Sequence, residues 1–468
     1  MIKYKRCCEV FMSFFDRFNG MTVNLLGAGV SNKPLVKKLA DGGAKVIIRD
    51  KKTVAELGAV ADEFASAGAQ FVCGEDYLSD ISGDLVFRSP GFRPDIAPLC
   101  AAVENGCQLT SEMEMFIENC PCPIIGLTGS DGKSTTTTLV ANILRESGHN
   151  CFLGGNIGEP LLNRIDNIKK DDIIAVELSS FQLMTIDSPV TVAVIKNITP
   201  NHLNWHTDMD EYIEAKAKIL KGAETAVLNY DDENCRKLSE RFDGEILWFS
   251  RRELPASLNG AFLREGELIM RYEGKETFVI KTDEILLPGE HNAENYATAV
   301  CATWGKTTVE AVRKVAREFG GVKHRFQVVR RDGGITYYNS SIDSSPTRTA
   351  AAISSLKCPV NIICGGYDKN IPFEPLAQAL VAHGKIKTVV LTGATMGKIK
   401  KALEDHPNFE SSGIKVICAP DFKDAVIAAA GEAEPGEAVL LSPACASFDA
   451  FENFEKRGEF FAETVKGL

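Results

Sequence analysis

Short apolar runs alternate with longer amphipathic stretches along most of this chain. The first example is an apolar run over residues 23–26, a glycine turn, an amphipathic stretch over 35–40 and a second apolar run over 45–48. Short runs rich in β-branched residues that alternate with helical stretches are typical of parallel sheets covered by helices. The pattern therefore predicts an α/β fold with parallel sheets.

Two breaks divide this pattern into three blocks. The first is the Cys120-Pro121-Cys122-Pro123 segment, and the second is the Gly320-Gly321 pair. Because proline and glycine interrupt regular structure, we expect an amphipathic lead-in helix over 1–20 and domains at 21–120, 121–321 and 322–468. A length of 468 residues agrees with three domains at about 150 residues each. Within the second block, residues 254–280 are rich in glycine and charge and predict a small antiparallel excursion.

Composition narrows the class of protein. Apolar residues make up 44% and charged residues 25% of the chain, which excludes a disordered or fibrous protein. The net charge of −11 argues against nucleic acid or an anionic membrane as a partner, because phosphate contacts need an excess of Lys and Arg. No run approaches the roughly 20 apolar residues that span a bilayer, and the 14 cysteines contain no C-x-x-C pair. We therefore expect a cytoplasmic protein with reduced thiols.

The strongest chemical signal is the segment 128–135 (TGSDGKST), which directly follows an apolar run. A glycine-rich turn at a helix N-terminus points backbone N–H groups at a phosphate, and the helix dipole favours the same anion. Lys133 is then placed to neutralise phosphate oxygens, and the Ser134 hydroxyl to bind Mg²⁺. The strict G-x-x-x-x-G-K-[ST] spacing fails, because Leu127 stands where its first glycine belongs. The segment predicts a phosphate loop of a variant kind.

A second glycine turn, 27–32 (GAGVSN), follows the first apolar run and resembles half of a dinucleotide-binding motif. Asp50 ends the next run, but Asn32 stands in place of the third glycine. Two readings remain open: a tight turn of any doubly wound sheet, or a turn that holds a pyrophosphate while Asp50 and Lys51 contact the nucleoside.

Two further residues follow apolar runs in the central block. Glu177 ends the run that begins at Asp172, where a carboxylate suits Mg²⁺ in a sheet that also carries a phosphate loop. His202 lies in the loop after residues 190–195. Taken alone, each could equally be an exposed polar residue.

Together these motifs are more specific than any one of them. From about residue 21 onward the chain resembles the Mur ligase family, and the last of the following motifs is similar to the branch that adds D-glutamate. The motifs are 129–134 (GSDGKS), 154–158 (GGNIG), 177–182 (ELSSFQ), 197–202 (NITPNH), 214–216 (EAK), 289–293 (GEHNA), 324–326 (HRF), 365–369 (GGYDK) and 441–454 (LSPACASFDAFENF).

The resemblance implies a Rossmann-like N-terminal domain, a central P-loop ATPase-like domain and a Rossmann-like C-terminal domain. It implies an ATP-dependent, ADP-forming amide ligase that joins D-glutamate to UDP-N-acetylmuramoyl-L-alanine through an acyl phosphate. Such an enzyme acts in cytoplasmic peptidoglycan precursor synthesis, and we expect it to be a monomer.

The resemblance also implies roles for individual residues. The catalytic set is Lys133, Glu177, His202 and Lys216. Two Mg²⁺ sites use Ser134, Glu177, His202 and Lys216, the lysine as a carbamate. ATP contacts are Gly129, Ser130, Asp131, Gly132, Lys133, Ser134, Thr135, Asn292, Arg325 and the position of Ser340. The UDP-substrate contacts are Gly29, Val30, Ser31, Asp50, Lys51, Ser89, Asn156 and Ser179, and D-glutamate meets Lys369, Ser447 and Phe454.

One position departs from the family. Ser340 stands where an Asp is expected to contact ATP, and Asp343 follows three positions later. Either Asp343 substitutes through a shift of the loop, or the ATP contact is weakened. We also expect the domains to close at hinges near Cys120 and Gly321, because the third block has to supply Arg325 and Lys369 to the reaction.

Three alternatives stay open. Another Mur ligase or a folylpolyglutamate synthase shares the phosphate loop, although the 441–454 motif argues against both. An NAD-dependent dehydrogenase explains Gly27, Gly29 and Asp50 but leaves Lys133 and Glu177 without a role. A degenerate nucleotide-binding protein gains some support from Ser340.

Overall fold

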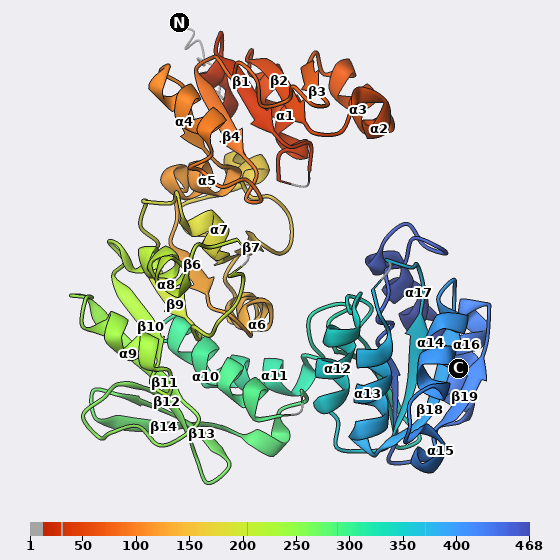
Figure 1. The fold of residues 1–468 in the computed structure, drawn as a ribbon. Helices are drawn as coiled ribbons and strands as arrows, with labels where there is room; N and C mark the ends of the chain where they lie inside the picture. The colour runs from red at the N-terminus through yellow and green to blue at the C-terminus, as the bar shows by residue number, and fades with distance from the viewer. Residues whose placement is uncertain (1–12, 30, 204, 288, 370) are drawn as a thin grey trace, which may run out of the picture. The chain divides into compact units, whose positions relative to one another are not determined.

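The computed structural model describes residues 13–29, 31–203, 205–287, 289–369 and 371–468. Within them the chain is a mixed α/β protein with three sheets, which confirms the predicted fold class (Figure 1). It divides into two compact units: Met1–Ile285 with Glu290–Arg317, and Leu286–Gly289 with Glu318–Leu468. The first unit holds two of the sheets, so the expected boundary at residue 120 lies inside it and stays a prediction. Most of the lead-in helix expected over 1–20 lies outside the described residues, and the described part forms the short 3-10 helix η1 (Phe14–Phe18).

The first sheet has five parallel strands in the order β3-β2-β1-β4-β5. Because the strand order reverses next to β1, the carboxyl ends of β1 and β4 form the place where such sheets bind ligands. This is the Rossmann-like arrangement predicted from the sequence. Its strands are β1 (Thr22–Leu26), β2 (Lys45–Asp50), β3 (Gln70–Cys73), β4 (Leu85–Arg88) and β5 (Gln108–Thr110), and its helices are α1 (Lys33–Asp41), α2 (Val54–Leu57), α3 (Ala59–Ser66), α4 (Ala97–Glu104) and α5 (Glu112–Asn119).

The second sheet has nine strands in the order β14-β13-β12-β11-β10-β9-β6-β8-β7. Strand β6 lies between β8 and β9 and pairs with both in parallel, so the carboxyl ends of these three strands meet at one edge. The strands are β6 (Ile124–Thr128), β7 (Cys151–Gly155), β8 (Ile173–Glu177), β9 (Val192–Ile195), β10 (Thr225–Asn229), β11 (Glu245–Ser250), β12 (Gly260–Arg264), β13 (Glu267–Tyr272) and β14 (Lys275–Lys281).

The antiparallel excursion expected over 254–280 is confirmed, because β13 pairs antiparallel with both β12 and β14. It extends the main sheet through a parallel pair of β11 and β12. The helices of this region are α6 (Lys133–Glu146), α7 (Ser180–Leu183), α8 (Met209–Ala217), α9 (Glu233–Ser239), α10 (Glu290–Thr303) and α11 (Val309–Glu318), with 3-10 helices η2 (Leu162–Asn167), η3 (Lys218–Leu220) and η4 (Thr282–Glu284).

The third sheet forms the second unit, with strand order β15-β16-β20-β17-β18-β19. All neighbours are parallel except the β15–β16 pair. Its strands are β15 (Gln327–Asp332), β16 (Ile335–Asn339), β17 (Val360–Gly365), β18 (Ile386–Thr392), β19 (Lys415–Cys418) and β20 (Ala438–Leu441). Its helices are α12 (Pro346–Ser354), α13 (Glu374–His383), α14 (Met396–Glu404), α15 (Phe409–Ser412), α16 (Phe422–Gly431) and α17 (Phe454–Lys466).

Among the described residues, no helix combines the length and the apolar character that crossing a bilayer requires.

Candidate active site

The phosphate loop connects β6 to α6, and two of its glycines are required by its geometry. Gly129 and Gly132 have φ values of 150° and 76°, a region that side chains rarely adopt. A Cβ atom on Gly129 would lie 2.8 Å from Cβ of Lys196, and one on Gly132 would lie 2.8 Å from Oδ1 of Asn295. The loop therefore fits closely against the end of β9 and against α10, and any larger residue would displace it.

The loop that follows β9 fixes the backbone of the phosphate loop. The N–H of Ser130 donates to the carbonyl oxygen of Asn197 at 2.9 Å and to its Oδ1 at 3.0 Å, and the N–H of Asp131 donates to the same Oδ1 at 2.8 Å. The Ser130 hydroxyl also lies 2.9 Å from the hydroxyl of Tyr212 on α8. Asn197 is therefore a structural determinant of the loop, although its sequence motif alone did not single it out.

Two lysines converge on one carbonyl of this loop. Nζ of Lys133 and Nζ of Lys216 donate to the carbonyl oxygen of Gly129 at 2.9 Å and 2.8 Å. Lys216 lies on α8 and is only 1% exposed. Burial, followed by the nearby charge of Lys133, lowers the pKa of Lys216 to about 7. The structure thus brings together two residues that are 83 positions apart in the numbering of the sequence.

Glu177 ends β8 beside the phosphate-loop strand, in register with Leu127. Its side chain is buried, and Oε1 accepts a hydrogen bond from Nδ2 of Asn156 at 2.9 Å. Its Oε2 is also buried and has no hydrogen-bond partner in the described part of the chain. A buried carboxylate oxygen without a partner is costly unless a cation or donor joins it, so this residue fits a metal ion.

His202 lies in the loop after β9 with a left-handed backbone, at φ 56°. Its ring meets the ring of Phe181 edge-on, with centroids 5.0 Å apart. Burial first, and then the charges of Lys133 and Lys216, lower the pKa of His202. The neutral imidazole is the form that binds metal ions.

The expected metal donors are therefore of mixed type. Ser134 is buried at the start of α6, and Glu177 and His202 supply a carboxylate and an imidazole. Across the described ranges no group of three or more His, Cys, Asp or Glu side chains is placed to hold a metal ion. The donor set predicted from the sequence contains only two residues of these types, so it depends on a hydroxyl and on modified Lys216.

Asn292 lies on α10, and a chain of amide contacts links it to the helix after the phosphate loop. Nδ2 of Asn295 donates to Oδ1 of Asn292 at 3.1 Å, and Oδ1 of Asn295 accepts from the hydroxyl of Thr136 at 3.1 Å. Sequence reasoning missed Asn295. The available signal was its spacing of three residues from Asn292, which places both on one helix face.

Hydrogen bonds from neighbouring strand ends hold the turn at residues 27–32, where Asn32 stands in place of the third glycine of the dinucleotide-binding motif. Oδ2 of Asp50 accepts from the N–H of Ala28 at 2.7 Å, and the Ser89 hydroxyl donates to the carbonyl of Leu26 at 2.7 Å. Asn32 is buried, and its amide donates to Leu26 O at 3.0 Å, Gly27 O at 3.0 Å and Ser89 Oγ at 3.1 Å. The residue that replaces the third glycine thus joins the ends of β1 and β4.

The remaining predicted UDP-substrate residues occupy different places. Gly29 and Ser31 lie on this turn, Lys51 is exposed after β2, and Val30 lies outside the described residues. Asn156 contacts Glu177, and Ser179 caps the N-terminus of α7 by accepting from the N–H of Gln182.

In the second unit, Ser340 and Asp343 belong to one buried cluster. Oγ of Ser340 accepts from the N–H of Phe326 at 3.1 Å, and Oδ2 of Asp343 accepts from the hydroxyl of Ser442 at 2.7 Å. Burial raises the pKa of Asp343, while hydrogen bonds from Ser340 and Ser442 oppose that rise. Asp343 is therefore adjacent to the position that departs from the family, as one of the two readings requires.

The residues expected to hold D-glutamate are also in the second unit. Ser447 is buried in the loop after β20, Phe454 begins α17 and Lys369 is exposed after β17. A cavity of about 210 Å³ lies nearby, and its lining includes Gly366, Asp449 and Arg457 but none of these three residues. Their role in binding D-glutamate stays a prediction.

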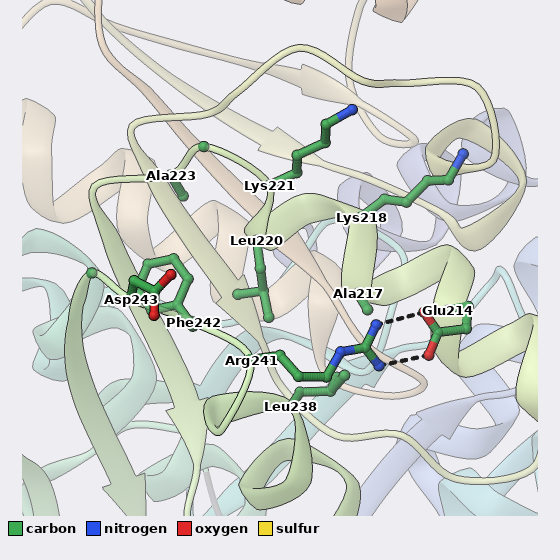
Figure 2. A pocket seen from close by; sticks show the side chains of 12 residues that line it. Glu214, Ala217, Lys218, Leu220, Lys221, Ala223, Leu238, Arg241, Phe242 and Asp243 are labelled. Carbon is green, nitrogen blue, oxygen red and sulfur yellow. Dashed lines mark hydrogen bonds and ion pairs between the residues drawn. The ribbon is translucent and has the colours of Figure 1, made fainter.

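A cavity of about 490 Å³ lies beside the end of α8, and its lining includes none of residues 128–135 (Figure 2). Its cationic side chains are already paired: Arg241 donates two bonds to Glu214, Lys218 donates to the carbonyl of Met184, and Lys221 lies 3.1 Å from Asp187. We assign it no part in the chemistry.

A glycine turn at a helix N-terminus, a lysine on that turn and a carboxylate with an unpartnered oxygen beside it define a phosphate-loop, nucleotide-binding class of protein. Comparison with known families agrees. The Mur ligase middle domain matches residues 127–303, and the Mur ligase glutamate ligase domain matches residues 324–445. The chain belongs to the Mur ligase family.

Individual relatives and solved structures agree with this membership. The UDP-N-acetylmuramoylalanine–D-glutamate ligase of Clostridium novyi (strain NT) is 44% identical over 98% of this chain and 100% of its own length. The ligase of the same name from Clostridium kluyveri (strain ATCC 8527) is 45% identical over 95% of this chain and 96% of its own. The solved UDP-N-acetylmuramate-alanine ligase of Thermotoga maritima has the same fold, with a TM-score of 0.56, 16% identity, and coverage of 96% of this chain and 99% of its own.

Proposed function

We propose that this chain is an ATP-dependent, ADP-forming ligase that joins D-glutamate to UDP-N-acetylmuramoyl-L-alanine in peptidoglycan precursor synthesis. Relatives named for that activity are 41–45% identical over at least 95% of the chain, which supports the proposed substrates. The observation that carries the proposal is the grouping of Lys133, Lys216 and the unpartnered oxygen of Glu177 around one phosphate loop.

The reaction needs two displacements. A carboxylate oxygen of the UDP-substrate attacks the γ-phosphorus of ATP, so that ADP leaves and an acyl phosphate forms. The amine of D-glutamate then attacks the acyl carbon, loses a proton, and phosphate leaves from the tetrahedral intermediate. Phosphoryl transfer depends on alignment and charge neutralisation more than on a nucleophilic side chain. Lys133 and the N-terminus of α6 supply positive charge at the phosphates.

Mg²⁺ would supply further charge neutralisation at the phosphates when bound. We propose that Ser134 and Glu177 hold one ion and that His202 and Lys216, the latter carbamylated, hold the second. In carbamylation the Lys216 ammonium first loses a proton. The neutral amine then attacks the carbon of CO₂ and releases a second proton, which leaves an anionic carbamate as an oxygen donor. The burial of this amine against the Gly129 carbonyl supports the assignment.

The substrate contacts follow the family. We propose that ATP meets residues 129–135, Asn292, Arg325 and the Ser340–Asp343 cluster, and that Lys369, Ser447 and Phe454 hold D-glutamate, the lysine pairing with a carboxylate. The UDP-substrate would meet Gly29, Val30 and Ser31 of the 27–32 turn. Its other proposed contacts are Asp50 and Lys51 at the end of β2, Ser89 after β4, Asn156 and Ser179. We further propose a monomeric, cytoplasmic enzyme.

The test is phosphate release with ATP, Mg²⁺, UDP-N-acetylmuramoyl-L-alanine and a panel of amino acids. We expect release only with D-glutamate, and a loss of about 10³-fold or more in Lys133→Ala, because a phosphate-binding cation is removed from the transition state. Lys221→Ala is the matched control, since this exposed lysine lies outside the loop and pairs with Asp187. Full activity of Lys133→Ala, or equal release with L-glutamate or L-alanine, would falsify the proposal.

A further inference from the structure

The segment after β4 crosses from the first sheet to the helices that surround the phosphate-loop site. Arg88, at the end of β4, is 1% exposed and donates to the carbonyl of Phe181 and to the hydroxyl of Thr185, both at 3.1 Å. Five residues later, Arg93 donates to the carbonyl of Trp205 at 2.8 Å. Arg88 at the end of β4 and Arg93 in the segment that follows are thus bonded to α7 and to the loop that carries His202.

Arg93 binds Glu211 of α8 with both ends of its guanidinium. Its Nη2 lies 2.8 Å from Oε1, and its Nη1 lies 3.0 Å from Oε2. The hydrogen bonds from Arg93 are the main reason why the pKa of Glu211 falls to about 2, so this carboxylate is ionised throughout the physiological range. A paired, planar contact of this kind fixes orientation as well as charge.

Glu211, held in place by Arg93, in turn contacts the buried side chain of His206. Oε2 of Glu211 lies 3.1 Å from Nδ1 of His206, and Nε2 of His206 lies 2.8 Å from the hydroxyl of Ser180. A carboxylate at Nδ1 selects the tautomer with hydrogen on that nitrogen, so Nε2 accepts from Ser180. Ser180 begins α7, three residues after Glu177. His206 is 2% exposed, and its contact with Ser180 is buried.

Aromatic rings connect the same arginine to His202. The Arg93 guanidinium lies 5.2 Å from the centroid of the Trp205 ring. The rings of Trp205 and Phe181 are 4.2 Å apart, and Phe181 meets the ring of His202 at 5.0 Å. Nε1 of Trp205 donates to the carbonyl of Gly91 at 3.4 Å, two residues from Ser89. The ring of a proposed metal donor therefore packs against a cluster of aromatic rings that the segment after β4 contacts.

We infer that Arg93 is a positioning residue that sets the orientation of His202 through Glu211, His206 and the Trp205–Phe181 rings. Arg93 thereby couples metal binding to the Ser89 turn, by which we mean the segment directly after β4 that carries Ser89. The inference rests on the proposed function, because that assigns His202 to a metal ion. Arg93 itself touches neither the phosphate loop nor Glu177 in the described structure. By linkage, a UDP-substrate that orders the Ser89 turn should strengthen metal binding, and the metal should strengthen UDP-substrate binding equally.

The experiment compares wild type with Arg93→Ala and Arg93→Lys. Binding of Mn²⁺ to the complex with ADP, followed by the electron paramagnetic resonance of free Mn²⁺, gives a reading that needs no turnover. Mg²⁺ dependence of phosphate release gives a second reading. We expect Arg93→Ala to weaken Mn²⁺ binding and to raise the Mg²⁺ concentration for half-maximal activity, each by about tenfold, the effect usual for residues that orient metal ligands. At saturating Mg²⁺, kcat should stay within about threefold of wild type, because no group that touches the reacting atoms is lost.

Arg93→Lys keeps a charge but loses the two-pronged contact, so we expect an intermediate shift. Arg164→Ala is the matched control, since that exposed arginine pairs with Glu159 instead of Glu211. Unchanged Mn²⁺ binding in a folded Arg93→Ala protein, or a fall in stability and kcat without a shift in metal dependence, overturns the inference. If Arg93→Ala does not fold, the same criteria apply to Arg93→Lys. A wild-type protein without D-glutamate-dependent phosphate release instead refutes the proposed function, and the Mn²⁺ measurement still decides whether Arg93 supports the metal site.

Discussion

Two buried lysines flank Gly129 and differ in their partners. Lys196 and Lys216 are each 1% exposed. Nζ of Lys196 lies 2.8 Å from Oε1 of Glu294, whose other oxygen binds Arg251. The hydrogen bonds of Lys216 in the described structure go to the Gly129 carbonyl and the Thr128 hydroxyl instead. Burial lowers the pKa of both lysines, but the Glu294 carboxylate opposes that change at Lys196.

The different partners of the two lysines indicate different roles for them. A carboxylate beside a buried lysine favours the cationic form, and here the pair connects the end of β9 to α10. Lys216 donates its hydrogen bonds in the described structure to neutral oxygens, and burial outweighs the nearby charges of Glu177 and Asp131 in lowering its pKa. Such a lysine is more readily deprotonated, and a neutral amine is a nucleophile. We expect Lys196 to be structural and Lys216 to be chemical.

The largest expected effect separates the two lysines by activity. Lys216→Met should lower kcat/KM for D-glutamate by about 10³-fold, or about 4 kcal/mol, because the proposed metal donor is lost. Lys196→Met should stay within about tenfold of wild type, since it removes no group from the phosphates. Phosphate release by both purified, folded variants measures this. Similar losses of kcat/KM in the two variants would contradict the different roles that we assign to Lys216 and Lys196.

A second prediction concerns stability and tests the ion pair. Glu294→Gln removes the carboxylate and leaves a buried ammonium without a counter-ion, so the free energy of unfolding should fall by about 3–5 kcal/mol. The double variant Lys196→Met with Glu294→Gln should lose less, because no isolated charge remains. Urea unfolding of the three proteins gives the comparison. A double variant that is less stable than Glu294→Gln would show that the pair is not the reason.

The smallest effect is a pH dependence from Lys216. Its pKa falls from 10.5 to about 7 on folding, so the unfolded chain binds more protons than the folded chain between these values. Stability therefore rises as pH increases through that window, and the cost of burying the cation is fully present below pH 7. Between pH 7 and 8.5 the gain should be about 1–2 kcal/mol. Unfolding of wild type and Lys216→Met in CO₂-free buffer should show this gain in wild type only, and parallel pH profiles would contradict it.

Local patterns predicted the parts of the site that depend on neighbouring residues. The strand, glycine turn and helix around Gly132, Lys133 and Ser134 form as the local pattern predicted, and Glu177 ends a strand of the same parallel sheet. The roles of these residues in phosphate and metal binding stay predictions. The pairing of Lys196 with Glu294 could not be predicted, since the two residues are 98 positions apart and only tertiary packing joins them.

Other features were beyond sequence reasoning for a different reason. Asn32 stands where the dinucleotide-binding motif has its third glycine. Its amide donates three hydrogen bonds that join the ends of β1 and β4, which the motif did not predict. The His206 contacts with Ser180 and Glu211 depend on how the loop after β9 packs under α7, which no periodicity encodes. The roles of Lys369, Ser447 and Phe454 stay predictions.

The contact between Arg93 and Glu211 has a practical consequence for protein engineering. Exchange of the first 120 residues with those of a relative would join a foreign segment to Glu211, His206 and Trp205. Unless the donor sequence supplies an arginine at the same place, the carboxylate and indole lose the partner that holds them. A functional hybrid therefore has to take residues 88–93 and residues 205–211 from the same parent protein.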